Sequence, residues 1–124
     1  LIVDVGHNPQ AAQALAQWLD RSHQGRVHAV YGALADKDVS GVLAALGHRI
    51  AHWHLAGLER DTPRGLPVEA VVARLHEVLP SACFDAHPGV MHALAAARQT
   101  ATPGDRILAF GSFFVASAVL AESV

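Results

Sequence analysis

Three short segments of this sequence hold side chains that can bind anions, hydroxyl groups or cations. Residues 4–9 read DVGHNP, residues 32–38 read GALADKD, and residues 111–113 read GSF. Each segment follows a short apolar run and precedes a stretch with helical spacing. Such a position is the start of a helix, where free backbone N–H groups and the helix dipole favour a bound anion. The sequence therefore predicts ligand chemistry at three strand-to-helix turns.

The first segment offers a carboxylate and two polar side chains. Asp4 lies at the end of an apolar run, from which it can reach a ribose hydroxyl or a cation. His7 and Asn8 stand at the expected helix start, where they can face an anion. A second interpretation is equally open from the residues alone. Asn8 then only caps the helix, and His7 is a turn residue.

The second segment contains Lys37, the only lysine among nine basic residues. It lies between Asp36 and Asp38 at a helix start, where the positive end of the helix dipole disfavours a cation. Lys37 therefore needs an anionic partner. The partner is either a flanking aspartate, in an ordinary surface salt bridge of little energetic weight, or a carboxylate or phosphate of a ligand. In the third segment, Ser112 can present its hydroxyl and N–H to an anion or can simply cap the next helix.

Other polar clusters carry weaker signals. The loop at residues 57–65 mixes acidic and basic side chains, which is typical of solvated surface. Among nine histidines, His52 and His54 are two residues apart and share one face of an expected strand, while His87 and His92 flank a later loop. No cysteine or carboxylate spacing completes a zinc set, so we expect no metal site and interpret the histidine pair as amphipathic strand filling.

Composition and missing motifs exclude several classes. The chain has 124 residues, 52% of them hydrophobic, which suits one folded domain. Its net charge of −2 provides no basic surface for nucleic acid, and no apolar run approaches the roughly 20 residues that span a membrane. Neither a GxGxxG dinucleotide fingerprint nor a phosphate-binding P-loop is present. The single Cys83 cannot form an internal disulfide, which fits the cytoplasm.

The elements that would position these segments alternate regularly. The expected strands span residues 1–5, 27–31, 50–55, 82–85 and 107–110. The expected helices span residues 9–20, 39–46, 68–79, 90–97 and 113–120. Alternation of this kind predicts an α/β fold with a parallel five-stranded sheet and helices on both faces. Ligands of such sheets bind beyond the carboxyl ends of the strands, which is where the three segments lie.

The order and spacing of these three segments resemble the C-terminal domain of the Mur ligase superfamily, most closely its folylpolyglutamate synthase/dihydrofolate synthase branch. The resemblance covers the whole chain, and WHLA at residues 53–56 and GDRIL at 104–108 also look typical of the bacterial enzymes. It implies that residues 1–124 form one glutamate ligase domain, a Rossmann-like three-layer sandwich with strand order first-fifth-second-third-fourth. It also implies a separate N-terminal domain, absent from this chain, with a P-loop, magnesium ligands and most of a folate site.

The chemistry implied by the resemblance is ATP-dependent amide formation. A dihydropteroate or folyl-glutamate carboxylate takes the γ-phosphoryl group of ATP, and L-glutamate attacks the resulting acyl phosphate. By resemblance, Asp4 and Asn8 bind ATP, whereas the incoming glutamate is held by His7, Lys37 and Ser112. No catalytic residue or metal ligand is expected in this chain alone, because ATP and Mg²⁺ are held mostly by the N-terminal domain, its expected partner. We therefore expect the isolated chain to be inactive.

Two other classes remain open at this point. One is the C-terminal domain of a cell-wall Mur peptide ligase. The other is a receiver-like signalling domain, which needs an acidic pair after the first strand and a lysine after the fifth. Here Asp4 is single and Lys37 follows the second strand, which argues against the receiver class. No nucleic-acid or membrane partner is expected.

Overall fold

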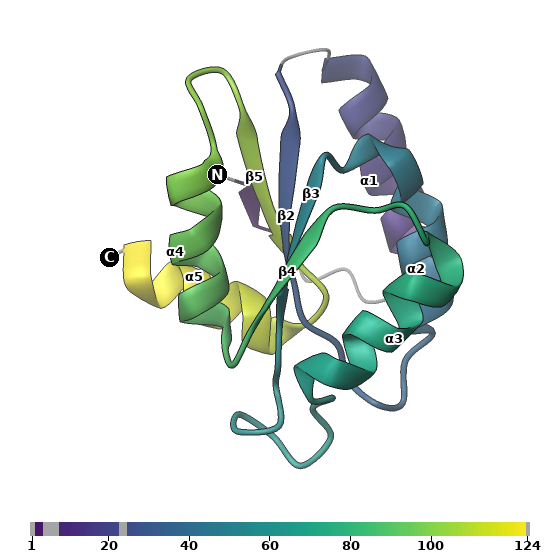
Figure 1. Cartoon of the computed structure of the whole chain (residues 1–124), viewed down its shortest axis with the longest axis vertical. Helices are drawn as coiled ribbons and strands as arrows, with labels where there is room; N and C mark the ends of the chain where they lie inside the picture. Colours follow the sequence, from purple (N-terminus) through teal and green to yellow (C-terminus); the bar gives the residue numbers. More distant parts are fainter. Residues whose placement is uncertain (1, 4–7, 23–24, 124) are drawn as a thin grey trace.

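A computed structural model describes residues 2–3, 8–22 and 25–123 of the chain. Their centre is one parallel sheet in the order β1-β5-β2-β3-β4, in which every neighbouring pair is parallel (Figure 1). The strands are β1 Ile2–Val3, β2 Val27–Tyr31, β3 His52–Ala56, β4 Phe84–His87 and β5 Arg106–Phe110. The predicted fold class and strand order are both confirmed.

Helices cover both faces of the sheet, which makes three layers (Figure 1). They are α1 Pro9–Ser22, α2 Val39–Leu46, α3 Val68–Val78, α4 Val90–Thr100 and α5 Phe113–Ser123. One 3₁₀ turn, η1 Gly47–Arg49, follows α2. The helices α1, α2 and α3 pack on one face, and α4 and α5 on the other, as the two buried clusters of the core show. No helix among the described residues is long and apolar enough to cross a membrane.

Alternate residues of each strand supply the two sides of the core. Tyr31, Trp53 and Phe110 face α1, α2 and α3, and the centroids of the Tyr31 and Phe110 rings are 4.9 Å apart. Val30 and Ala109 point the other way, against α4 and α5. This period of two follows from the pleat of a strand. The central strand β2 is buried along its whole length, as expected for a sheet covered on both faces.

Most predicted helix limits hold because the predicted caps form. Asp38 accepts a hydrogen bond from the Gly41 amide, and Gly47 ends α2 with a φ of 47°. The fourth strand differs from the expectation, since it runs two residues later than residues 82–85. The reason is local: the Ala82 amide donates to the Leu79 carbonyl at 3.0 Å, which holds Ala82 in a turn after α3.

Gly111 allows the ends of β5 and β2 to touch. Its φ is 121°, a conformation that side chains rarely adopt. A Cβ atom at this position would lie 2.1 Å from the Gly32 carbonyl oxygen and 2.9 Å from the Tyr31 ring. Two of the three segments singled out in the sequence are therefore in direct backbone contact.

We expect Gly111→Ala to lower the free energy of unfolding by about 2 kcal/mol or more, because backbone strain and a clash with a carbonyl both follow. Gly89→Ala is the matched control. Gly89 has a φ of −157° and nothing within 4 Å of an added Cβ, so its change should stay below about 1 kcal/mol. Urea unfolding measures both values, and equal losses in the two variants would contradict the close approach.

Candidate functional site

The described residues of the three segments, 8–9, 32–38 and 111–113, gather at the carboxyl ends of the strands. Besides the contact between Gly111 and Gly32, the starts of α1 and α2 meet, since a Cβ on Gly41 would lie 2.7 Å from Pro9 Cγ. Strand β5 lies between β1 and β2, so α1 and α5 leave neighbouring strands toward opposite faces (Figure 1). This is the switch point at which open α/β sheets bind ligands.

The loop at residues 32–38 is held by the loop that follows β3. Leu34 and Gly65 form an isolated antiparallel bridge. The Ala35 amide donates to the Arg64 carbonyl at 2.7 Å, and the Leu66 amide donates to the Ala33 carbonyl at 3.0 Å. The mixed charges of residues 57–65 predicted solvated surface, whereas the backbone of this loop holds the segment that carries Lys37.

Lys37 does not use its neighbouring aspartates. Asp38 Oδ1 accepts the Gly41 amide at 2.9 Å as the cap of α2, and Asp36 lies 4.0 Å from the Arg64 guanidinium. Lys37 is half-buried and forms no ion pair with any residue that the structure describes. The surface salt bridge considered above is therefore not formed here. No carboxylate among the described residues therefore balances this cation at the start of α2.

The pKa of Tyr31, which lies at the end of β2, is also changed by its surroundings. Burial raises the pKa of the Tyr31 phenol, and the nearby Asp38 carboxylate raises it further. The phenol therefore stays neutral at physiological pH and belongs to the core beneath the loops, where it packs against Phe110.

The other predicted site residues that the structure describes, Asn8 and Ser112, both cap helices. Asn8 Oδ1 accepts the Ala11 amide at 2.8 Å and caps α1. Ser112 Oγ accepts the Val115 amide at 3.3 Å and caps α5, with only 1% of the residue exposed. The Ser112 hydroxyl still has its own proton to donate. Asp4 and His7 lie outside the described residues.

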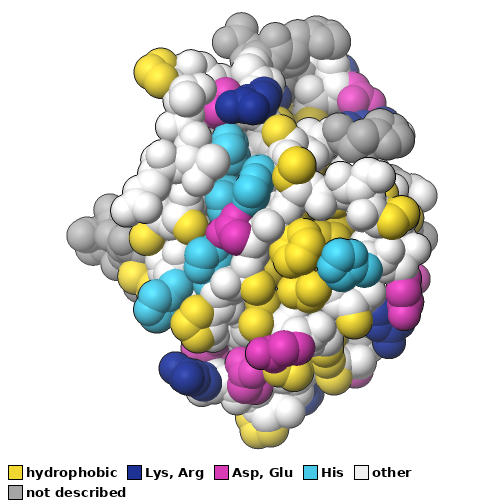
Figure 2. Space-filling model, viewed as in Figure 1, with side chains coloured by type: hydrophobic (Ala, Val, Ile, Leu, Met, Phe, Trp, Pro, Cys, Tyr) yellow, Lys and Arg dark blue, Asp and Glu magenta, His cyan; other side chains and the backbone are white. Residues whose placement is uncertain are grey.

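A second cluster of polar side chains lies on the α4 and α5 face of the sheet, along β3 and β4. Figure 2 shows histidines gathered around a carboxylate there. The carboxylate is Asp85, and it contacts ring nitrogens of His52, His54 and His87, with His54 Nδ1 at 3.0 Å. His54 Nε2 lies 3.3 Å from Nδ1 of the buried His28.

The chain of contacts ends at Asp105, whose Oδ2 is 3.1 Å from His28 Nε2. The pKa of Asp105 lies well below its usual range, mainly because the Thr102 amide donates to the carboxylate; burial opposes this and the contact with His28 adds to it. Burial lowers the pKa of His54 to about 4, against the opposing charge of Asp85. For Asp85, burial raises the pKa, but hydrogen bonds from His87 and His52 outweigh it and the pKa is lowered.

Part of this cluster could be predicted from the strand pattern of the sequence, as follows from the period of two. That pattern placed His52 and His54 on one strand face, which is confirmed, but assigned no carboxylate to them. Asp85 follows His54 by 31 residues and reaches it only because the parallel register pairs the two positions. The usable signal was the alternation of polar residues in two expected strands, 52 with 54 and 85 with 87, which puts all four on one face.

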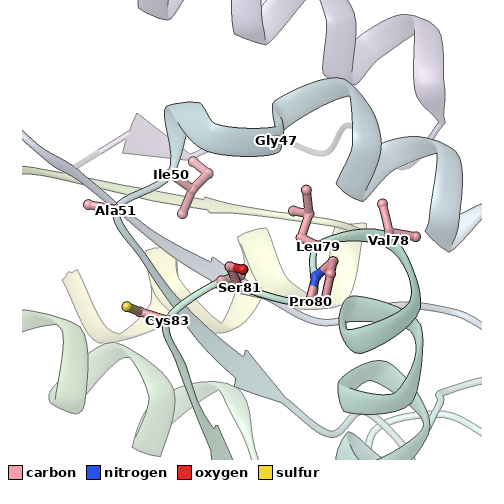
Figure 3. Close-up of a pocket in the computed structure, with 9 residues that line it drawn as sticks. Gly47, Ile50, Ala51, Val78, Leu79, Pro80, Ser81 and Cys83 are labelled. Carbon is pink, nitrogen blue, oxygen red and sulfur yellow. The ribbon is translucent and has the colours of Figure 1, made fainter.

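Two hollows of the surface lie away from Lys37. One, of about 350 Å³, is open beyond the amino ends of β3 and β4 and is lined by apolar side chains such as Ile50, Val78 and Leu79 (Figure 3). The other, of about 190 Å³, lies between the loop after β3 and the start of α4, beside Met91. Neither is lined by the residues predicted to bind ligand.

Comparison with known proteins defines the class. Residues 1–113 match the family described as the glutamate ligase domain of Mur ligases. The chain therefore belongs to the Mur ligase family, as a glutamate ligase domain. This membership rules out the receiver-like alternative.

The similar proteins named in the comparisons come from one branch of that family. The dihydrofolate synthase/folylpolyglutamate synthase of Haemophilus influenzae is 38% identical over 116 residues, which are 91% of this chain and 26% of that protein. Escherichia coli FolC in complex with DHPP and ADP has a TM-score of 0.86 at 35% identity, over 98% of this chain and 28% of that chain.

A third relative, a bifunctional folylpolyglutamate synthase/dihydrofolate synthase with Mn, AMPPNP and L-glutamate bound, has a TM-score of 0.82 at 39% identity. The match covers 97% of this chain and 28% of that one. The chain thus spans about a quarter of the length of the curated relatives it matches.

The free energy of unfolding can test the different roles of Asp36 and Asp38, the two aspartates beside Lys37. We expect Asp38→Ala to lower the free energy of unfolding by about 1 kcal/mol, because it removes a helix cap. Asp36→Ala should change it by less than about 0.5 kcal/mol, since an exposed pair at this distance contributes little. Chemical unfolding measures both, and an effect of Asp36→Ala as large as that of Asp38→Ala would contradict the assignment.

Proposed function

We propose that this chain is the C-terminal domain of an ATP-dependent ligase that adds L-glutamate to dihydropteroate, folyl-glutamates or both. The proposal is supported by membership of the glutamate ligase family and by relatives that are 38% and 37% identical to this chain over 91% and 97% of its length. These relatives also favour the folate branch over the cell-wall ligases, the alternative left open by the sequence.

The observation that carries the proposal is the state of Lys37. It is half-buried at the switch point and has no ion pair within the described part of the chain, and Asp38 beside it serves as the cap of α2. L-Glutamate brings two carboxylates, and an ammonium group without a partner can receive one of them as a charge-assisted hydrogen bond. In this proposal Lys37 holds the incoming amino acid.

The remaining assignments follow the family resemblance. We assign Asp4 and Asn8 to the nucleotide, and His7 and Ser112 to glutamate. Asn8 is exposed and its amide nitrogen can still donate while its oxygen caps α1. Ser112 is buried, so direct contact with glutamate requires the β5–α5 turn to open; in the closed turn it acts by fixing the start of α5.

ATP and Mg²⁺ belong, in this proposal, mainly to an N-terminal domain that precedes this one. Mg²⁺ takes oxygen ligands, preferably carboxylates and phosphates. Of the two carboxylates beside Lys37, Asp38 caps α2 and Asp36 faces Arg64. We therefore do not assign a magnesium site to them. ATP supplies the phosphoryl group that activates the substrate carboxylate. The residues of this chain contribute position and charge when the two domains close over the substrates.

Kinetics of the full-length parent enzyme test the role of Lys37. Losing a charge-assisted hydrogen bond costs about 1.5–3 kcal/mol, so Lys37→Gln should raise the KM for L-glutamate roughly 10- to 100-fold. The KM for ATP should change little, and Lys37→Arg should restore part of the loss. Arg74→Gln, at an exposed position of α3, is the matched control. A raised KM for ATP with an unchanged KM for glutamate would contradict the assignment.

The substrate is tested by following ADP release from the full-length enzyme with dihydropteroate, folates or UDP-muramyl peptides in the presence of L-glutamate. We expect turnover with the first two only, and none from the 124-residue chain alone. Turnover with muramyl peptides alone would move the protein to the cell-wall branch. Glutamate-dependent ADP release by the isolated chain would show that its active site is complete without another domain.

A further inference from the structure

The histidine cluster around Asp85 lies outside the proposed glutamate site. It lies on β3 and β4, on the face of the sheet that α4 and α5 cover, and includes no residue of the loop that holds Lys37. The proposed ligase chemistry does not use it. The cluster is also partly open to solvent: the side chains of His52, His87 and Asp85 are 27%, 19% and 36% exposed, while His54 at its base is fully buried.

The hydrogen-bonded chain from Asp105 to Asp85 is one proton short. It runs from Asp105 through His28 and His54 to Asp85 and contains three contacts between polar atoms. Each contact needs one proton. A carboxylate oxygen can only accept a hydrogen bond, and two ring nitrogens that face each other need one proton between them. Two neutral imidazoles carry two protons. One contact is therefore left with two lone pairs facing each other, unless a further positive charge is present.

The contacts at Asp85, at one end of this hydrogen-bonded series, favour a positive charge there. If His28 donates to Asp105 and His54 donates to His28, the unprotonated nitrogen is His54 Nδ1, 3.0 Å from an Asp85 oxygen. Ring nitrogens of His52 and His87 reach the same carboxylate. Three imidazoles thus converge at this end, whereas only one reaches the end at Asp105 among the described residues.

The spacing suits a small metal ion. The candidate ligand atoms of His52, His54 and Asp85 all lie within 4.8 Å of one another. Ligand atoms about 2.1 Å from a tetrahedral zinc ion are roughly 3.4 Å apart, so modest side-chain rotations would admit the ion. Neutral His52 and His87 can each present a free Nε2 by keeping their proton on Nδ1.

We propose that this cluster binds one divalent transition-metal ion of the Zn²⁺ class through His52, His54 and Asp85, with His87, which contacts the same carboxylate, turning in as the fourth ligand. The ion takes the place of the missing proton between His54 and Asp85. Three imidazoles and one carboxylate are a donor set that zinc accepts and that magnesium, which prefers oxygen, does not. Because the ligands come from β3 and the edge strand β4, the ion joins these two strands and stabilises this edge of the sheet.

Titration calorimetry of the 124-residue chain, freed of metal and without a histidine tag, tests the site. We expect one equivalent of Zn²⁺ to bind with micromolar affinity or tighter, and the melting temperature to rise with added Zn²⁺. Mg²⁺ should not bind at this strength. No Zn²⁺ binding would overturn the proposal and leave the extra proton on an imidazole, and equal binding of Mg²⁺ would overturn the assignment to a nitrogen-preferring ion.

Three variants locate the ion. His52→Gln and Asp85→Asn change partly exposed side chains, and each should weaken Zn²⁺ binding at least about tenfold. His76→Gln is the matched control, since it removes an exposed imidazole on α3 that lies outside the cluster. It should leave the affinity unchanged. Unaltered affinity in both cluster variants, or an equal loss in His76→Gln, would place the ion elsewhere.

Two further measurements guard against misfolding and nonspecific binding. Far-ultraviolet circular dichroism without metal should be the same for all variants, so that a loss of affinity reports a lost ligand. Co²⁺ in place of Zn²⁺ should give the intense visible bands of a four-coordinate site, and Asp85→Asn should remove or shift them. A six-coordinate spectrum that no variant alters would contradict ligation by the cluster.

Discussion

The position of β5 between β1 and β2 is the constraint on which the carboxyl edge depends. Hydrogen bonds on both sides of β5 bring its last residues level with the ends of its neighbours, and the loop that follows must pass over the end of β2. Gly111 makes this passage possible because the space above Gly32 leaves no room for a Cβ atom. The starts of α1, α2 and α5 are then fixed around one point, and the predicted ligand-binding residues that the structure describes, Asn8, Lys37 and Ser112, lie at or near one of them.

Crowding three helix starts into one place determines what the polar residues there can do. A helix start needs acceptors for its free amides, and Asn8, Asp38 and Ser112 each provide one. Lys37 has no such use, because an ammonium group cannot accept a hydrogen bond. The same local rule that makes Asp38 a helix cap gives Lys37 no capping role, as the proposed binding of a glutamate carboxylate requires. Under that proposal, hydrogen-bonding chemistry separates structural from ligand-binding roles within a few residues.

Much of this arrangement could be predicted from sequence. The strand and helix alternation, the caps at Asn8 and Asp38, and the clustering of the turns all follow from local periodicity and from the geometry of parallel sheets. What could not be predicted depends on pairing between distant residues. The bridge between Leu34 and Gly65 and the contact between His54 and Asp85 both require a strand register, which nothing in the local sequence of either strand specifies. The delayed start of β4 likewise depends on a turn bond made after α3.

The backbone bridge between the loops after β2 and β3 also sets where this domain can tolerate change in length. Leu34 and Gly65, with the flanking amide bonds of Ala35 and Leu66, clamp the base of the loop, so an inserted residue there would shift the Lys37 segment. The exposed tip at residues 59–61 lies beyond the clamp and is free of that requirement. Insertions in the loop at residues 57–65 should therefore be tolerated at its tip, where they leave the backbone of residues 32–38 unchanged.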